Sequence, residues 1–395
     1  MELSTDTKIF DYDSLLTVSI QKSKTVTDID IISTCHINNR IYMNFENTGT
    51  YNIIDYQGVG EVDICNYTKL ALLHLSEKEN IIISNPTEAL NSVYWNSVFY
   101  ILQEAGYKNI LWIDGGLTKG ELFRHIDILN ITHIFSGFFF RNLFRPDIFG
   151  EMPTSGDIAN KNKLFVCISR LARQERFYFT SKILKDIDLY EKGILSCAWG
   201  DNTIDVFEDK NLNLLLEQDI INKFPISLNH EETEESVTGF YEEFTSAIFH
   251  IVQESSVGYD PRTHRKTYSK LPIDWRIVNS DRLFFTEKSA KPFCCNQIPL
   301  FVAAPGYVEM LRKLGFDVFD DIIDHTYDKE DNVFNRCDLV FKELKRISEM
   351  HTTEEWLKFL ESNYISERFV KNRERLMEIN EEQENKSATW IRENF

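Results

Sequence analysis

Short apolar runs alternate with longer amphipathic stretches from about residue 81 onward. Residues 81–84 form an apolar run that predicts a strand, and residues 87–105 have the apolar spacing of a helix. A second apolar run, at 109–113, ends in an Asp-Gly-Gly turn sequence. Strands that alternate with helices are typical of βαβ units, so this part of the chain predicts an α/β fold with a parallel sheet.

The alternation continues along the chain, whereas residues 1–80 predict shorter strands and turns, with strand-like runs at 29–32 and 40–44. After about residue 333 the chain is charged and helical, and we expect two or three helices there. Further strands are expected at 132–136, 164–169, 247–253, 282–285 and 300–303, and further helices at 119–129, 173–189, after Thr286 and at 307–314.

Residues 145–162 interrupt this pattern. They carry two prolines, two glycines and several polar residues, and show no periodicity, which is typical of a linker between domains. A chain of 395 residues also exceeds the roughly 250 to 300 residues at which single cores stop growing. We therefore expect an α/β domain at 1–150, a second at 163–335, and helices at 336–395 that pack back on the body.

Composition narrows the class of protein. Hydrophobic residues make up 43% and charged residues 27% of the chain, as in an ordinary globular protein. No apolar run approaches the roughly 18 residues of a membrane span, and the first residues lack the pattern of a secretory signal, so a cytoplasmic location is expected. The net charge of −19 disfavours a generic polyanion binder, because phosphate contacts need local positive potential.

The sequence carries no motif for a metal or a tightly bound cofactor. Its seven cysteines are irregularly spaced and include no CxxC pair, which favours buried thiols over a disulfide framework or a zinc site. No GxGxxG or Walker-type loop is found. The triplet Asp28-Ile29-Asp30 has the letters of a metal-binding DxD motif but is expected to lie in a strand.

The most informative segment begins at Thr286, which can cap a helix at the end of an apolar run. Glu287, Lys288 and Lys291 follow in the first turns of that helix. Lysines near a helix N-terminus are electrostatically unfavourable unless an anion binds there, and the exposed backbone N–H groups help to hold a phosphate. The alternative is an ordinary surface pair of Glu287 and Lys291 at i,i+4 spacing.

The pattern TEKxxKP at 286–292, with Pro305-Gly306 and the stretch 311–328, resembles the donor-binding segment of GT-B-type glycosyltransferases. The resemblance is to the fucosyltransferase-like C-terminal domain and to phage-encoded glycosyltransferases, and it covers about 165–330. His325 stands where such proteins typically have an acidic residue. The resemblance implies a GT-B-like fold, in which two Rossmann-like domains face a cleft, with a C-terminal helical tail.

The resemblance also implies roles for individual residues. The C-terminal domain would bind the nucleotide-sugar donor, and the N-terminal domain would be the acceptor side. Lys291 would act as an electrostatic catalyst on the diphosphate leaving group, and no metal would be required. The implied donor-binding residues are Arg170, Arg173, Glu254, Thr286, Glu287, Lys288 and Lys291.

A base and an acceptor site are less well marked. Asp114, at the end of a predicted strand, is the first candidate for the carboxylate that deprotonates an acceptor hydroxyl, with Glu88 second. A turn-forming Asp-Gly is the alternative for Asp114. The most basic stretch of the chain includes Arg262, Arg265 and Lys266, which fits an acceptor-binding patch or a solvated loop.

These features predict a glycosyltransferase with more than one possible acceptor. Low Ala and Gly with abundant Ile, Asn and Lys fits an AT-rich genome such as that of a phage. This and the basic stretch slightly favour a hydroxymethylated base in phage DNA, which must be flipped out of the duplex to react. A cell-surface or capsular glycan is the alternative acceptor, and a non-catalytic binding protein on a transferase scaffold is the alternative class.

Overall fold

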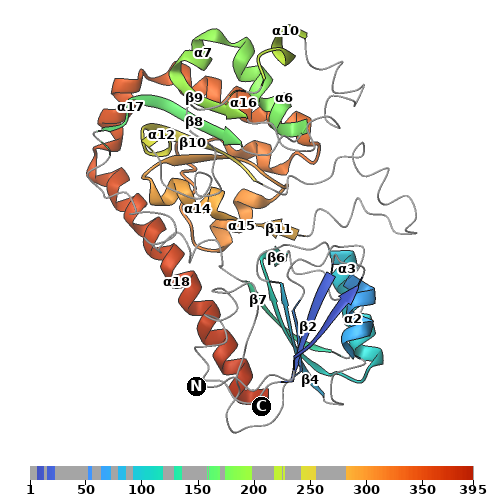
Figure 1. The fold of residues 1–395 in the computed structure, drawn as a ribbon. Coiled ribbons are helices and arrows are strands. Elements are labelled where there is room, and N and C mark those ends of the chain that lie inside the picture. The colour runs from blue at the N-terminus through green and yellow to red at the C-terminus, as the bar shows by residue number, and fades with distance from the viewer. Residues whose placement is uncertain are drawn as a thin grey trace. The chain divides into compact units, whose positions relative to one another are not determined.

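A computed structural model of the chain shows an α/β protein with parallel sheets and helices (Figure 1). The residues fall into two compact units. Unit 1 comprises residues 1–139, 273–284 and 378–395, and unit 2 comprises residues 140–272 and 285–377. The structure describes residues 7–12, 16–22, 52–55, 64–72, 79–85, 92–118, 129–135, 158, 160–169, 174–197, 218–224, 226, 242–254 and 282–394.

Unit 1 contains a six-stranded sheet in which the last four strands of the spatial order are parallel. Helices α2 (Ile64–Leu72) and α3 (Ser92–Glu104) connect its parallel strands, and β6 (Gly116–Thr118) pairs separately with β11 (Arg282–Phe284) in antiparallel fashion. The order across the sheet is β1 (Thr7–Tyr12), β2 (Leu16–Lys22), β3 (Asn52–Asp55), β4 (Asn80–Asn85), β5 (Asn109–Asp114) and β7 (Asn130–Phe135), with β3, β4, β5 and β7 mutually parallel.

Aromatic rings of α3 and β5 form the core of unit 1. Trp95 and Phe99 of α3 place their rings 5.1 Å and 5.4 Å from the ring of Trp112. The neighbouring strand contributes Ile81, Ile82 and Ile83, all fully buried. Continuous burial of successive residues explains why the sequence shows apolar runs here rather than polar–apolar alternation.

Unit 2 contains a four-stranded parallel sheet with a change of direction in its strand order. Its strands are β8 (Lys163–Ser169), β9 (Gly193–Cys197), β10 (Ala247–Gln253) and β12 (Ile298–Val302), in the spatial order β12-β10-β8-β9. From β8 the chain moves first to one neighbour, β9, and later to the other, β10. The carboxyl ends of β8 and β10 therefore flank a topological switch point, where open α/β sheets bind their ligands.

Helices cover both faces of the unit 2 sheet (Figure 1). Phe249 of β10 contacts Trp356 of α17 on one face, while Glu254, which follows β10, contacts Ser289 of α14 on the other. The helices are α6 (Gln174–Lys185), α7 (Ile187–Lys192), α10 (Gln218–Ile221), α12 (Glu242–Thr245), α14 (Glu287–Cys294), α15 (Tyr307–Lys313), the 3-10 helix η2 (His325–Lys329), α16 (Val333–Met350), α17 (Thr353–Leu360) and α18 (Asn363–Asn394).

Helix α18 contributes to both units. Residues 363–377 belong to unit 2 and residues 378–394 to unit 1. In unit 1 it lies at the edge strand β7, where Lys386 donates to the carbonyl of His133 at 2.7 Å and the N–H of Phe135 donates to Gln383 at 3.2 Å. These contacts use polar groups that an edge strand otherwise exposes. In the described part of the chain, no helix combines the length and apolarity needed to cross a membrane.

Several expected elements differ from the structure. The helix expected at 173–189 is two helices, because Asp186 accepts a hydrogen bond from Leu189 N at 3.2 Å and starts α7. The strand expected at 282–285 exists, but pairs with β6 and lies outside the parallel sheets. Strand β9 was not expected. The strand-like runs at 29–32 and 40–44 and nearly all of the helix at 119–129 lie outside the described residues.

Candidate functional site

Buried polar side chains gather at the switch point of unit 2. Ser169, the last residue of β8, is hydrogen-bonded to the side chain of Gln253, the last residue of β10. Arg176 of α6 donates to the carbonyls of Gln253 and Glu254, each at 3.3 Å. Buried polar groups destabilise a fold unless they are hydrogen-bonded. Here the hydrogen bonds join the ends of β8 and β10 to each other and to the start of α6.

Glu254 follows β10 directly and is fully buried. Its carboxylate accepts hydrogen bonds from the backbone N–H of Thr286 at 3.2 Å and from the hydroxyl of Ser289 at 2.6 Å. The hydroxyls of Thr286 and Tyr307 lie 2.9 Å and 3.2 Å from it. A negative charge at the start of α14 is favourable for the helix dipole, so Glu254 anchors the N-terminus of α14 to the sheet.

The first N–H groups of α14 are already bonded within the chain. Thr286 caps the helix as expected, and its hydroxyl oxygen accepts from Lys288 N at 3.2 Å. The N–H of Ser289 donates to the carbonyl of Thr286 at 3.2 Å. Because these donors and that of Thr286 have partners, an anion at this helix would be met by side-chain charges rather than by the backbone.

Three charged side chains of α14 lie close together. The ammonium of Lys288 is 2.9 Å from Oε1 of Glu287, and the Lys288 side chain is 30% exposed whereas that of Glu287 is 8% exposed. Burial alone would raise the pKa of Glu287, but the charge and hydrogen bond of Lys288 outweigh it and hold the pKa below its usual value. Lys291 is buried, with its ammonium 4.1 Å from the ring centre of Phe244. Burial lowers the pKa of Lys291 to about 8, although the Glu287 carboxylate acts in the opposite direction.

A buried lysine holds the other end of α14. The ammonium of Lys161 donates to the carbonyls of Thr245 at 2.9 Å, Ala247 at 2.8 Å and Cys295 at 3.0 Å. All three of its protons thus have acceptors. Helix α14 is therefore fixed at its start by Glu254 and just beyond its end by Lys161, which gives its charged side chains a defined place.

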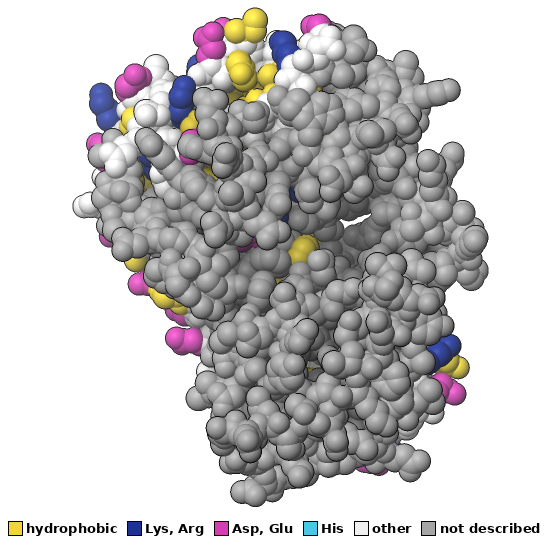
Figure 2. Space-filling model, viewed as in Figure 1, with side chains coloured by type: hydrophobic (Ala, Val, Ile, Leu, Met, Phe, Trp, Pro, Cys, Tyr) yellow, Lys and Arg dark blue, Asp and Glu magenta, His cyan; other side chains and the backbone are white. Residues whose placement is uncertain are grey.

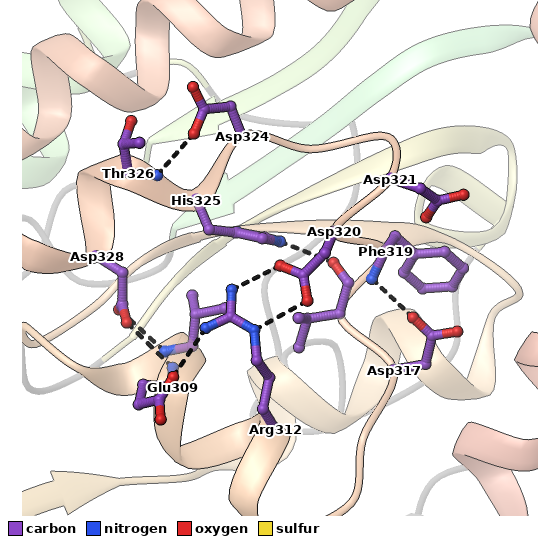
Figure 3. A network of polar contacts seen from close by, with 12 residues as sticks. Glu309, Arg312, Asp317, Phe319, Asp320, Asp321, Asp324, His325, Thr326 and Asp328 are labelled. Carbon is purple, nitrogen blue, oxygen red and sulfur yellow. Dashed lines mark hydrogen bonds and ion pairs between the residues drawn. The ribbon is translucent and has the colours of Figure 1, made fainter.

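Residues between α15 and Asp328 hold helix α15 in place (Figure 3). The carboxylate of Asp328 accepts from Val308 N at 2.9 Å and from Glu309 N at 3.0 Å, so it caps α15. His325 lies 2.8 Å from the carbonyl of Val318, which can only accept, so Nε2 of His325 carries a proton.

The neutral form of His325 fits its surroundings. Its Nδ1 lies 2.7 Å from the hydroxyl of Tyr327, and burial lowers its pKa. Arg312 forms a two-pronged ion pair with Asp320, at 2.9 Å and 2.6 Å (Figure 3). These contacts give His325 and Asp328 structural roles beneath α15.

No family model, no curated protein and no solved structure matches the chain. The function therefore has to be argued from the site itself.

The other expected site residues are placed as follows. Asp114 ends β5 in unit 1, is fully buried, and accepts a hydrogen bond from Gly116 N at 2.5 Å. This is the geometry of an Asp-Gly turn, the alternative considered for that residue. The expected residues that lie outside the described part of the chain are Glu88, Arg170, Arg173, Arg262, Arg265 and Lys266.

Sequence reasoning missed several residues that build the site. They are single polar residues whose hydrogen-bond partners lie elsewhere in the chain, so a single sequence carries no distinct signature for them. Among the described residues, no group of three or more His, Cys, Asp or Glu is arranged to hold a metal ion. The missed residues are Lys161, Ser169, Gln253, Ser289 and Tyr307.

Proposed function

We propose that the chain is a glycosyltransferase that takes a sugar from a nucleotide-sugar donor and binds that donor with unit 2. The observation that carries the proposal is the switch point between β8 and β10. Arg170 follows the carboxyl end of β8, and Glu254 follows that of β10. The basic and acidic residues picked from the sequence are thus attached to the two strands beside which open α/β sheets bind nucleotides.

Lys288 is the residue of α14 best suited to a diphosphate. It is the more exposed of the two lysines of α14. When a phosphate binds the Lys288 ammonium, its present partner Glu287 becomes available to accept hydrogen bonds from the ribose hydroxyls. Transfer breaks the bond between the anomeric carbon and a diphosphate oxygen, so negative charge develops on the leaving group. A fixed ammonium at that oxygen stabilises the transition state more than the ground state.

The acceptor hydroxyl forms the new bond to the anomeric carbon and loses its proton to a carboxylate, for which Asp114 is our candidate. On the face in Figure 2, acidic and basic side chains of the described residues are interspersed rather than gathered by sign. For a DNA acceptor, the proposed contact is the most basic stretch of the sequence, with Arg262, Arg265 and Lys266. Transfer assays with hydroxymethylated DNA and with oligosaccharides separate the two acceptor classes, and donor binding without transfer would favour the scaffold protein.

The test is a thermal-shift screen of the full chain against UDP-, GDP-, dTDP- and CMP-linked sugars. A donor present at a thousand times its Kd stabilises the folded protein by about 4 kcal/mol, so a clear shift is expected with one nucleotide class. Lys288→Gln should weaken that donor roughly 10- to 100-fold, because hydrogen bonds to charged groups contribute about 1.5–3 kcal/mol.

Lys313→Gln is the matched control, since Lys313 also pairs with a helix glutamate but is 66% exposed. It should leave the donor shift unchanged. If no donor shifts the melting temperature, or if both lysine variants lose the shift equally, the proposal is wrong.

A further inference from the structure

The side chain of Asn85 in unit 1 is buried and has no hydrogen bond to the residues that the structure describes. It is the last residue of β4 and is 1% exposed. Neither its Nδ2 nor its Oδ1 has a hydrogen-bond partner among the residues that the structure describes.

Asn85 lies in a row of residues across the carboxyl edge of the sheet. The register pairs Asn85 with Asp114 of β5, and Asp114 with Phe135 of β7. Paired residues of neighbouring strands share a face, so an amide, a carboxylate and an aromatic ring lie side by side. The row beneath it consists of Ile83, Trp112 and His133, with the last two rings 4.2 Å apart.

An unbonded buried amide is unfavourable for folding, because it loses its hydrogen bonds to water and gains none. An apolar residue of the same size would serve the core better. Residues that break the rules of packing tend to lie at functional sites. The carboxyl edge of a parallel sheet is also where α/β proteins place such sites.

We propose that Asn85 and Asp114 bind an alcohol hydroxyl of a ligand. A hydroxyl is both a donor and an acceptor. It can donate a hydrogen bond to the Asp114 carboxylate while its oxygen accepts one from Nδ2 of Asn85. A second hydroxyl or a ring N–H on the same ligand would reach Oδ1 of Asn85. The ring of Phe135 provides an apolar surface for the ligand's carbon skeleton. The proposal deepens the proposed function, on which it rests for the identity of this ligand as the acceptor.

The decisive variant is Asn85→Leu in the full chain. If the amide serves a ligand, Leu removes the unbonded polar group and the melting temperature should rise by about 2–4 °C. The matched control is Asn80→Leu in the same strand, because Oδ1 of Asn80 accepts from the amide of Asn109 at 2.7 Å. That control should lower the melting temperature.

Binding is measured by ligand-observed NMR with two probes that share a primary alcohol, methyl α-glucoside and 5-hydroxymethyl-2′-deoxycytidine. The wild-type protein should bind one of them, Asn85→Leu should weaken it at least about tenfold, and Asn80→Leu should leave it unchanged. Asn85→Ala provides the same reading if the Leu variant fails to fold. The probe that binds identifies the source of the hydroxyl.

Two results would overturn the proposal: neither alcohol binding to the wild-type protein, or Asn85→Leu lowering the melting temperature with unchanged binding. Both results are independent of the donor screen, which measures nucleotide-sugar binding and its dependence on Lys288 in unit 2. If no nucleotide sugar binds but an alcohol does, the hydroxyl site in unit 1 is supported and the proposed transferase function is wrong. If a donor binds and no alcohol does, the hydroxyl site alone is wrong.

Discussion

Lys291 combines a full positive charge with almost complete burial. Its ammonium faces the ring of Phe244, which provides a weakly negative surface, and Glu287 lies on the same helix. Burial nevertheless dominates and lowers its pKa to about 8 from the ordinary value of 10.5. Protonation of this residue therefore favours the unfolded chain.

The pH dependence of stability follows from that difference. Between about pH 8 and pH 10.5 the unfolded chain binds a proton at Lys291 that the folded protein does not, so this residue makes stability rise with pH across that window. Below pH 8 its destabilising effect is fully present. Lys291→Met should raise the free energy of unfolding at pH 7, and its advantage over wild type should shrink between about pH 8 and pH 10.5, measured by urea unfolding of both proteins at several pH values. A wild-type curve that runs parallel to that of the variant would contradict this.

Single residues differ in how far the sequence could place them. Thr286 was predicted as a helix cap because a Thr between an apolar run and charged residues has a local signature, and the structure confirms it. The partners of Glu254 could not be predicted. Ser289 is 35 and Tyr307 53 residues away in the chain, and such distances leave no periodic trace in one sequence.

At the level of elements, one arginine fixes α18 to the turn before η2. The guanidinium of Arg368 pairs with Asp317 and Asp321, and lies 4.5 Å from the ring centre of Phe319. Phe319 has a φ of 62°, a left-handed conformation that is unfavourable for a bulky residue. The contacts of Arg368 hold this turn in place against that local strain.

Arg368→Lys should not restore these contacts, because lysine lacks the planar fork that reaches two carboxylates and stacks on a ring. We expect Arg368→Lys and Arg368→Ala each to lower the free energy of unfolding by about 1–2 kcal/mol, since two partly exposed ion pairs and the ring contact are lost or weakened. Lys371→Ala, at an exposed position of the same helix, is the control and should have little effect. Urea unfolding of the three variants provides the measurement, and an Arg368→Lys protein as stable as wild type would contradict it.

The types of elements were more predictable than their partners. The strands at 81–84, 109–113, 164–169 and 247–253 and the helices at the end of the chain were predicted from apolar periodicity and are confirmed. Which strands pair depends on contacts far apart in sequence. That is why neither the pairing of β6 with β11 nor the strand order of unit 2 could be read beforehand.

Considered as a whole, the chain returns to unit 1 twice after leaving it. Residues 378–394 supply Gln383 and Lys386 to the edge of β7, and Ile379 and Trp390 are buried. Contact between distant segments of this kind has no local signal, so the sequence predicted only that the last helices pack back on the body.

A chain that stops after Met377 should lose the structure of unit 1 and keep that of unit 2. Without residues 378–394, the edge of β7 would expose unpaired polar groups. Unit 1 would also lose the buried apolar side chains that α18 contributes to its core. Hydrogen exchange should then be fast at the amides of β4, β5 and β7 and slow at those of β8 and β10. Slow exchange in β5 of the shortened chain would show that unit 1 does not need α18.

The place of α18 also sets an order of events during synthesis. A ribosome adds about 5–20 residues per second, and domains generally fold as they emerge, the N-terminal one first. Here the strands that emerge first cannot complete their unit until the last helix is made, because unit 1 includes residues 378–394. Unit 2 can close first, although it is encoded later. The newborn chain therefore carries an open β7 edge for most of its translation, and this is the interval in which a chaperone would be needed.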